Sequence, residues 1–410
     1  MFPAAAAQLL AAALGMNATL ELGLRAEARG LDGGPPGQRA FAPVPYELTP
    51  SVRLAAQVDP RLSVATSLVA RCLMLAGPAG GAAVHSVAGY LDGTAATAWR
   101  ASERLTLGLS LGAAGGRQST SALAQAYAPG DVAPTAPQPG QPGASAPPPL
   151  DPYAGVRTGR TTTLSAQAGL DWRATRSVTI GGTAGGSRSG GSSEADRQIF
   201  PLRQVWSAEA YASLAAARLD TVALRAGGSR TEVGSTDRID LATLSTRWER
   251  RGDDDALSVS AGAVATMVDT TSTVASGPLG RVAPSAGATF SRAAPTGGRG
   301  VGLRVAATYA PFVDPYVARV RQRLSGLAGI GWNPRQDVQL DMGVSAATAM
   351  DPSRTGPSVV AADLGATIRR DRWEIGLSLR GAYQEAEAPL PTTWQWGLRC
   401  DLRWPGRTAG

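Results

Sequence analysis

Apolar and polar residues alternate strictly in many segments of this chain. The stretch TTWQWGLRCDLRW, residues 392–404, shows the pattern without a fault. One set of alternate positions carries Trp394, Trp396, Leu398, Cys400, Leu402 and Trp404, and the other carries Gln395, Gly397, Arg399, Asp401 and Arg403. Successive side chains of a strand point to opposite faces. The stretch is therefore predicted to be a strand with one apolar and one charged face.

The same period of two recurs along the chain and predicts eighteen strands. Their centres lie near residues 24, 54, 68, 92, 109, 167, 181, 209, 224, 243, 261, 287, 305, 326, 342, 364, 378 and 399. No stripe with a helical period of 3.6 residues competes with this pattern. Short connections such as DPR (59–61) and RDR (370–372) alternate with longer ones. The longest, 117–158, is rich in proline and cannot sustain ladder hydrogen bonds.

The tryptophans divide into two groups according to the connection that each adjoins. Those beside the short connections are Trp99, Trp172, Trp248, Trp332, Trp373 and Trp404, and those beside the long ones are Trp206, Trp394 and Trp396. Amphipathic indole rings prefer the boundary between membrane and water. The two groups are therefore predicted to form two interfacial girdles, and the apolar faces between them to contact lipid.

A sheet that crosses hydrocarbon must close on itself, because every backbone polar group there needs a partner. The chain thus resembles the outer-membrane β-barrels of Gram-negative bacteria: all-β, antiparallel, about 18 strands (16–18), with short periplasmic turns and longer extracellular loops. Its last strand, ending in Trp404, is similar to the aromatic signal that the barrel-insertion machinery reads. Residues 405–410 form a short tail beyond it, which is a departure from that family. A soluble β-sandwich or solenoid is the alternative fold.

The predicted organisation has three parts. Residues 1–18 contain a dozen apolar residues followed by small ones, as in a secretory signal peptide, although no basic residue follows Met1. Residues 19–404 form the single barrel, with 117–158 as a long extracellular loop. Residues 405–410 form the tail.

The charged residues indicate what the polar faces could bind. All 39 basic residues are arginines, and the net charge is +7. Arg319, Arg321 and Arg323 occupy alternate positions of one predicted strand and form a ladder on its polar face. The other candidate anion-binding residues of the lumen are Arg25, Arg304, Arg380, Arg399 and Arg403. Guanidinium groups bind carboxylate, sulfate or phosphate with fixed fork geometry. Two alternatives stay open: pairing of these arginines with carboxylates across strands, and a coding bias against lysine.

Sites for chemistry are scarce. Residues 108–112, GLSLG, match the G-x-S-x-G pattern of hydrolases, but Ser110 lies between two lipid-facing leucines, and that motif needs a sharp turn into a helix. His85 is the only histidine, so a zinc site is not expected. We expect no enzyme activity, no cofactor, no metal and no binding to nucleic acid. A barrel enzyme built around His85 is the least favoured alternative.

These observations predict a channel with an arginine-rich lumen. By strand number it resembles sugar-specific porins and, more closely in charge, the porins that export acidic exopolysaccharide. That resemblance implies an anionic solute or polysaccharide as cargo and a separate periplasmic polysaccharide-export protein as partner. The alternative function is a structural or adhesive barrel that acts through its extracellular loops.

Overall fold

The computed structural model describes residues 17–32, 45–75, 86–119, 158–234, 237–269, 282–293, 300–314, 319–351, 354–370, 373–385 and 393–405. The predicted signal segment, apart from its last two residues, lies outside this part of the chain, as do His85 and residues 406–410 of the predicted tail. So does most of the Pro-rich connection. Its two ends are strand in the structure, because β5 extends to Ser119 and β6 begins at Thr158.

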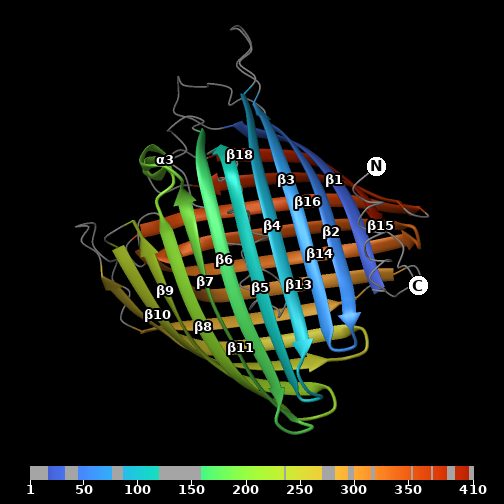
Figure 1. The fold of residues 1–410 in the computed structure, drawn as a ribbon, viewed down its shortest axis with the longest axis vertical. Helices are drawn as coiled ribbons and strands as arrows, with labels where there is room; N and C mark the ends of the chain where they lie inside the picture. The colour runs from blue at the N-terminus through green and yellow to red at the C-terminus, as the bar shows by residue number, and fades with distance from the viewer. Residues whose placement is uncertain are drawn as a thin grey trace.

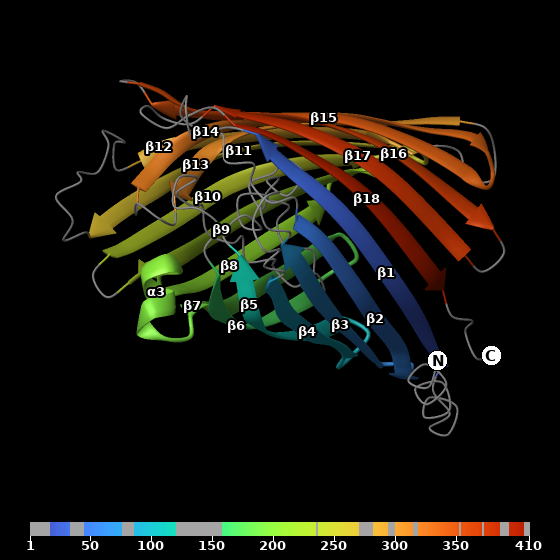
Figure 2. The same cartoon turned by 90° about the horizontal axis from the view of Figure 1, so that it is seen from above.

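Eighteen antiparallel strands form one closed sheet (Figures 1 and 2). Their bounds in chain order are β1 Asn17–Asp32, β2 Pro45–Asp59, β3 Leu62–Leu75, β4 Ser86–Arg100, β5 Leu105–Ser119, β6 Thr158–Arg173, β7 Val178–Gly191, β8 Arg203–Ala215, β9 Asp220–Val233, β10 Asp237–Arg251, β11 Asp255–Asp269, β12 Val282–Arg292, β13 Gly300–Asp314, β14 Arg319–Arg335, β15 Val338–Asp351, β16 Arg354–Arg370, β17 Trp373–Glu385 and β18 Thr393–Pro405. Each of the eighteen predicted centres falls within one of these strands. The predicted fold class is confirmed.

Consecutive strands are neighbours around the whole barrel, and β1 pairs with both β2 and β18. The register of the closing pair places Leu24 opposite Leu402 and Arg25 opposite Asp401. Figure 2 shows β1, in dark blue, lying beside β18, in red. Closure leaves no edge unpaired among the eighteen described strands, which is the condition for crossing hydrocarbon as a sheet.

Between the two ends of the barrel, the outward phase of the strands carries exposed apolar residues. Leu109 and Leu111 of β5, Leu244 of β10 and Leu379 of β17 each keep about half of their surface exposed (46%, 48%, 55% and 51%). A soluble sheet would bury such residues in a core. With these apolar faces turned outward on a closed barrel, the predicted location in the outer membrane of a Gram-negative bacterium is confirmed. Within the described residues, no helix has the length and hydrophobicity needed to cross a membrane.

The two ends of the barrel differ in their connections. Tight turns such as Pro60–Arg61 and 336–337 join strands at one end, here called the turn end, which faces the periplasm in barrels of this class. The other end, here called the loop end, carries the long connections. Some connections there are as short as the turns, among them 234–236, 315–318 and 352–353, so the regular alternation of short and long connections is only partly met.

One short helix, α3 (Glu194–Ile199), follows β7 at the loop end. Ser193 caps it, and a capping box joins Ser193 to Asp196. The Phe200 ring is 1% exposed and lies against Gly159, which is on the inward phase of β6. A Cβ at residue 159 would come within 2.7 Å of this ring. The helix therefore packs against the lumen side of the β6 rim, and the sequence analysis did not predict it.

Candidate functional site: the lumen wall

The inward phase places a set of arginines on the lumen wall. Of the predicted lumen arginines, Arg25, Arg304, Arg323, Arg380, Arg399 and Arg403 lie on this phase, as the exposed apolar residues on either side of each one show. The side chains of Arg319 and Arg321 lie outside the described part of the structure, so the ladder predicted with Arg323 stays a prediction. Arg323 itself is partly buried.

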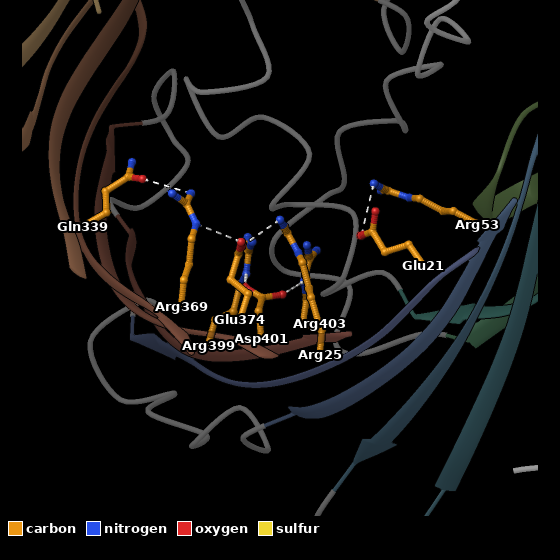
Figure 3. Close-up of polar contacts among 9 residues, drawn as sticks. All are labelled: Glu21, Arg25, Arg53, Gln339, Arg369, Glu374, Arg399, Asp401 and Arg403. Carbon is orange, nitrogen blue, oxygen red and sulfur yellow. Dashed lines mark hydrogen bonds and ion pairs between the residues drawn. The ribbon is translucent and has the colours of Figure 1, made fainter. Parts of the chain in front are cut away.

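Three of these arginines, Arg25, Arg399 and Arg403, belong to one band that crosses the closing seam, here called the seam band. Its members are Gln339 of β15, Arg369 of β16, Glu374 of β17, Arg399, Asp401 and Arg403 of β18, Glu21 and Arg25 of β1, and Arg53 of β2. Figure 3 shows their side chains rising from the wall on the same side of the sheet. The band thus joins six neighbouring strands, and its Arg369–Glu374–Arg403 part lies at the turn end.

Two carboxylates organise the seam band, and each is shared by two guanidinium groups. Asp401 accepts from Nε of Arg25 at 2.8 Å and from Nε of Arg399 at 2.5 Å. Glu374 accepts from Nε of Arg369 at 3.2 Å and from Nη1 of Arg403 at 3.2 Å. The strand registers impose this sharing, because Arg25 faces Asp401 across the seam, and Glu374 faces both Arg369 and Arg403.

The ends of the seam band are more loosely held. Arg53 Nη1 lies 3.9 Å from a Glu21 oxygen, and Arg369 Nη2 donates to the Gln339 side-chain oxygen at 3.2 Å. Arg53 and Arg369 are 61% and 57% exposed, so these contacts are screened by water and individually weak.

The seam band carries more positive than negative charge. Its cations are Arg25, Arg53, Arg369, Arg399 and Arg403, and its anions are Glu21, Glu374 and Asp401. Five positive minus three negative charges leave +2. The alternative that lumen arginines only pair across strands is therefore met in part: the pairs exist, and the band's own three carboxylates do not neutralise its five arginines. Further carboxylates of the same strands, Glu47, Asp341 and Asp363, lie on the inward phase outside the band, and Asp341 accepts from Gln339 at 2.9 Å.

A second group of charges lies on β6 and β8–β10. Arg225 Nη1 lies 3.1 Å from a Glu209 oxygen, and its guanidinium carbon lies 5.8 Å from the centre of the Tyr211 ring. Glu249 binds both Arg247 and Arg251. With Asp171, which accepts from the Tyr211 hydroxyl, three arginines face three carboxylates. This group is balanced, so the surplus charge of the two groups comes from the seam band.

A glycine makes room for the Tyr211 contact. Gly181 lies on the inward phase of β7, opposite Tyr211 in β8 and Asp171 in β6. A Cβ at residue 181 would come within 2.5 Å of the Tyr211 ring and 2.6 Å of an Asp171 oxygen. The ring therefore lies across the bare backbone of β7 to reach a carboxylate two strands away.

Arg304 and Arg380 differ from the seam band. Neither forms an ion pair with another described residue, although Arg380 of β17 lies opposite Asp363 of β16 in the register. They present guanidinium groups on the lumen side without a bonded carboxylate in that part of the structure. The sequence analysis identified both by phase but missed Arg369, which has the same inward phase because Ile368 beside it is outward and 48% exposed.

The nine tryptophans lie at both ends of the barrel. Trp99, Trp172, Trp248, Trp332, Trp373 and Trp404 are near the turn end, and Trp206, Trp394 and Trp396 are near the loop end. Trp394 contacts Tyr383 edge to face, with ring centres 4.8 Å apart. Trp206 packs on Gly186, whose missing Cβ would come within 2.5 Å of the indole. Their girdle role stays a prediction.

No protein-family model matches the chain, and no curated protein is significantly similar to it in sequence. Solved structures are similar in fold. A BenF-like porin from Pseudomonas fluorescens Pf-5 is 8% identical over 95% of this chain and 98% of its own, with a TM-score of 0.50. OccK9 (OpdG) of Pseudomonas aeruginosa is 13% identical over 95% and 98%, with a TM-score of 0.49. OpdK of P. aeruginosa, solved with vanillate, is 11% identical over the same shares, also with a TM-score of 0.49.

At these identities, the fold is what the chain shares with the neighbours. The BenF-like protein is named as a porin, and none of the three is named as a polysaccharide-export porin, so the closer resemblance to the export group is not shown. Within the described residues, no group of three or more His, Cys, Asp or Glu side chains is arranged to hold a metal ion.

Proposed function

We propose that the barrel is a channel whose lumen favours anionic solutes. The observation that carries this proposal is the surplus of +2 on the seam band, where Glu374 and Asp401 are each shared by two guanidinium groups. A shared carboxylate cannot neutralise both partners, so donor capacity remains for a passing anion.

Small side chains on one part of the wall support an open path along it. The inward positions of β5–β7 include Gly108, Ser110, Gly112, Thr183 and Gly185. Side chains alone can fill the lumen of an eight-stranded barrel, whereas eighteen strands enclose a wider lumen. A wide polar path with arginines on one side would pass anions through many weak, exchangeable contacts.

The test is single-channel recording of the refolded protein in a planar bilayer, with the reversal potential measured across a KCl gradient. Wild type is compared with Arg304→Gln/Arg380→Gln, which removes two lumen charges without breaking an ion pair of the described residues. We expect an anion-selective wild type and a permeability ratio of anion to cation that falls about twofold in the variant.

The matched control is Arg370→Gln. Arg370 lies on the outward phase of β16, opposite Trp373, and its loss removes one positive charge from outside the lumen. Its reversal potential should equal that of wild type. Cation selectivity of the wild type, or equal shifts in the lumen variant and the control, would contradict the proposal.

Export of an acidic exopolysaccharide, with a separate periplasmic export protein, is a finer form of the same proposal. It predicts that soluble polyuronate added on one side blocks the anion current, and that neutral dextran of equal length does not. A folded, inserted barrel without conductance would instead favour the structural or adhesive function, in which the pairs on β8–β10 and at the seam close the lumen.

A further inference from the structure

A cluster of outward arginines lies at the loop end of β5–β10. Arg188 of β7 and Arg230 of β9 are exposed there, on either side of Trp206 of β8. In the β8–β9 pairing, Trp206 lies opposite Arg230. In the β7–β8 pairing, it lies opposite Gly186, which is two residues from Arg188. The indole is 57% exposed and lies on the outer surface between the strand positions of Arg188 and Arg230.

Neighbouring strands extend this cluster, which is called the basic rim below and consists of Arg117, Arg160, Arg188, Trp206, Arg230 and Arg238. Asp240 accepts from Nε of Arg230 at 2.8 Å and from Nη2 of Arg238 at 2.6 Å, which fixes both side chains. The carboxylates on the same face are Asp240 and Glu232. Five arginines minus two carboxylates leave +3 on this outward surface.

Two of the arginines face each other directly. Arg117 of β5 and Arg160 of β6 are opposite in the register, and both are exposed. Like charges directly opposite in an antiparallel pair are destabilising unless an anion lies between them. Neither residue forms an ion pair with another described side chain. Asp196 of α3 accepts from the backbone N–H of Arg160 at 3.0 Å, and it does so from the lumen side of the strand.

The position of the basic rim determines what can neutralise it. An outward arginine costs about 2–4 kcal/mol at the bilayer midplane but about 0–1 kcal/mol near the interface. Exposed Trp206 is typical of the headgroup level. Leu164, opposite Arg188, is 59% exposed and faces the acyl chains. The groups that meet this surface are therefore lipid headgroups, and guanidinium forks bind phosphate oxygens in pairs.

We propose that the basic rim binds the phosphate groups of lipid A, the phosphorylated glycolipid of the outer leaflet. Arg188 and Arg230 donate hydrogen bonds to phosphate oxygens on either side of Trp206. The indole ring packs against the lipid A sugar and the first methylenes of its acyl chains. Arg238 and Asp240 hold Arg230 in place. This site lies outside the barrel and does not depend on what the lumen conducts.

The test uses full-length protein refolded from denaturant in detergent, and hence free of bound lipopolysaccharide. Bisphosphorylated lipid A is titrated, and bound copies are counted by native mass spectrometry. We expect Arg188→Gln/Arg230→Gln to weaken binding at least tenfold. Arg188→Gln alone breaks no ion pair of the described residues and should weaken lipid A binding by a smaller factor. This single variant provides the test if the double variant misfolds.

Two comparisons make the result specific. Arg370→Gln, beside Trp373 at the opposite end of the barrel, should bind lipid A as wild type does. Lipid A stripped of its phosphates should bind wild type and the double variant equally weakly. Unchanged affinity of the arginine variants, equal weakening by Arg370→Gln, or full affinity for the dephosphorylated lipid would each overturn the proposal.

Discussion

The ion pair between Arg25 and Asp401 can be broken from either side, and the two variants separate charge from structure. Asp401→Asn removes the acceptor of both Arg25 and Arg399 and takes the seam band from +2 to +3. Arg25→Gln removes one donor and takes it to +1. Both variants lose the 2.8 Å bond across the seam. Their effects on the closure of the barrel therefore have the same sign, and their effects on lumen charge have opposite signs.

The magnitudes follow from exposure and distance. Asp401 is 17% exposed and Arg25 39%, so the stability lost is about 1–2 kcal/mol, at the lower end for Arg25→Gln because Asp401 keeps Arg399. A unit charge about 8 Å from a passing ion is worth about 0.5 kcal/mol in water, and 0.1 M salt reduces this by about half. Each variant should therefore change the permeability ratio by about 1.5-fold.

The assay is the reversal potential of single channels in a salt gradient, together with the urea midpoint of unfolding followed by heat-modifiable gel mobility. We expect Asp401→Asn to be more anion-selective than wild type and Arg25→Gln to be less so, while both unfold at lower urea. Selectivity changes in the same direction for both variants would refute the reasoning, because pore shape and not charge would then control selectivity.

Three further predictions test the wall elsewhere. Leu109→Arg, which places a charge on the lipid face, should cost about 2–4 kcal/mol of unfolding free energy, whereas Ser110→Arg on the lumen face should fold normally, as measured by urea titration in lipid vesicles. Gly181→Ala should push Tyr211 off its site and lower the unfolding midpoint, and the change should vanish in a Tyr211→Ala background. The pKa of Asp196, outside the membrane, is lowered mainly by the Ser193 hydroxyl. The cap of α3 is therefore fully formed above the ordinary carboxyl pKa and is lost as pH falls through the lowered value. Amide exchange in α3 should show this loss, and Asp196→Asn should abolish the pH dependence of the exchange.

Strand number and side-chain phase could be predicted from the sequence because apolar and polar residues alternate with a period of two. That alternation identifies a strand and shows which of its residues share a face. Leu109 and Ser110 were assigned to opposite faces from their alternation alone, and the structure agrees. The eighteen strands were likewise identified without any contact information.

Side-chain partners could not be predicted in this way. The sharing of Glu374 by Arg369 and Arg403 depends on how far each strand is shifted against the next, and that shift comes from turn geometry and barrel stagger. The helix α3 was missed because six residues are too few for a helical period to be visible. Arg188 and Arg230 were missed because alternation was used to find apolar outward residues, and these two lie beyond the apolar band.

The closing of β18 onto β1 also bears on how the barrel assembles. The contact between Arg25 and Asp401 joins residues 376 positions apart, whereas every other strand pairing joins consecutive strands. Hairpins can therefore form one after another, but the last pairing waits for the whole chain, and β1 keeps an open edge until then. Glu21 and Arg25 on that edge discourage pairing with other strands, as inward charges do on edge strands in general. Charges that line the lumen of the finished barrel thus protect the unfinished barrel from pairing with other strands. The unpaired state of the β1 edge ends when Asp401 of β18 pairs with Arg25.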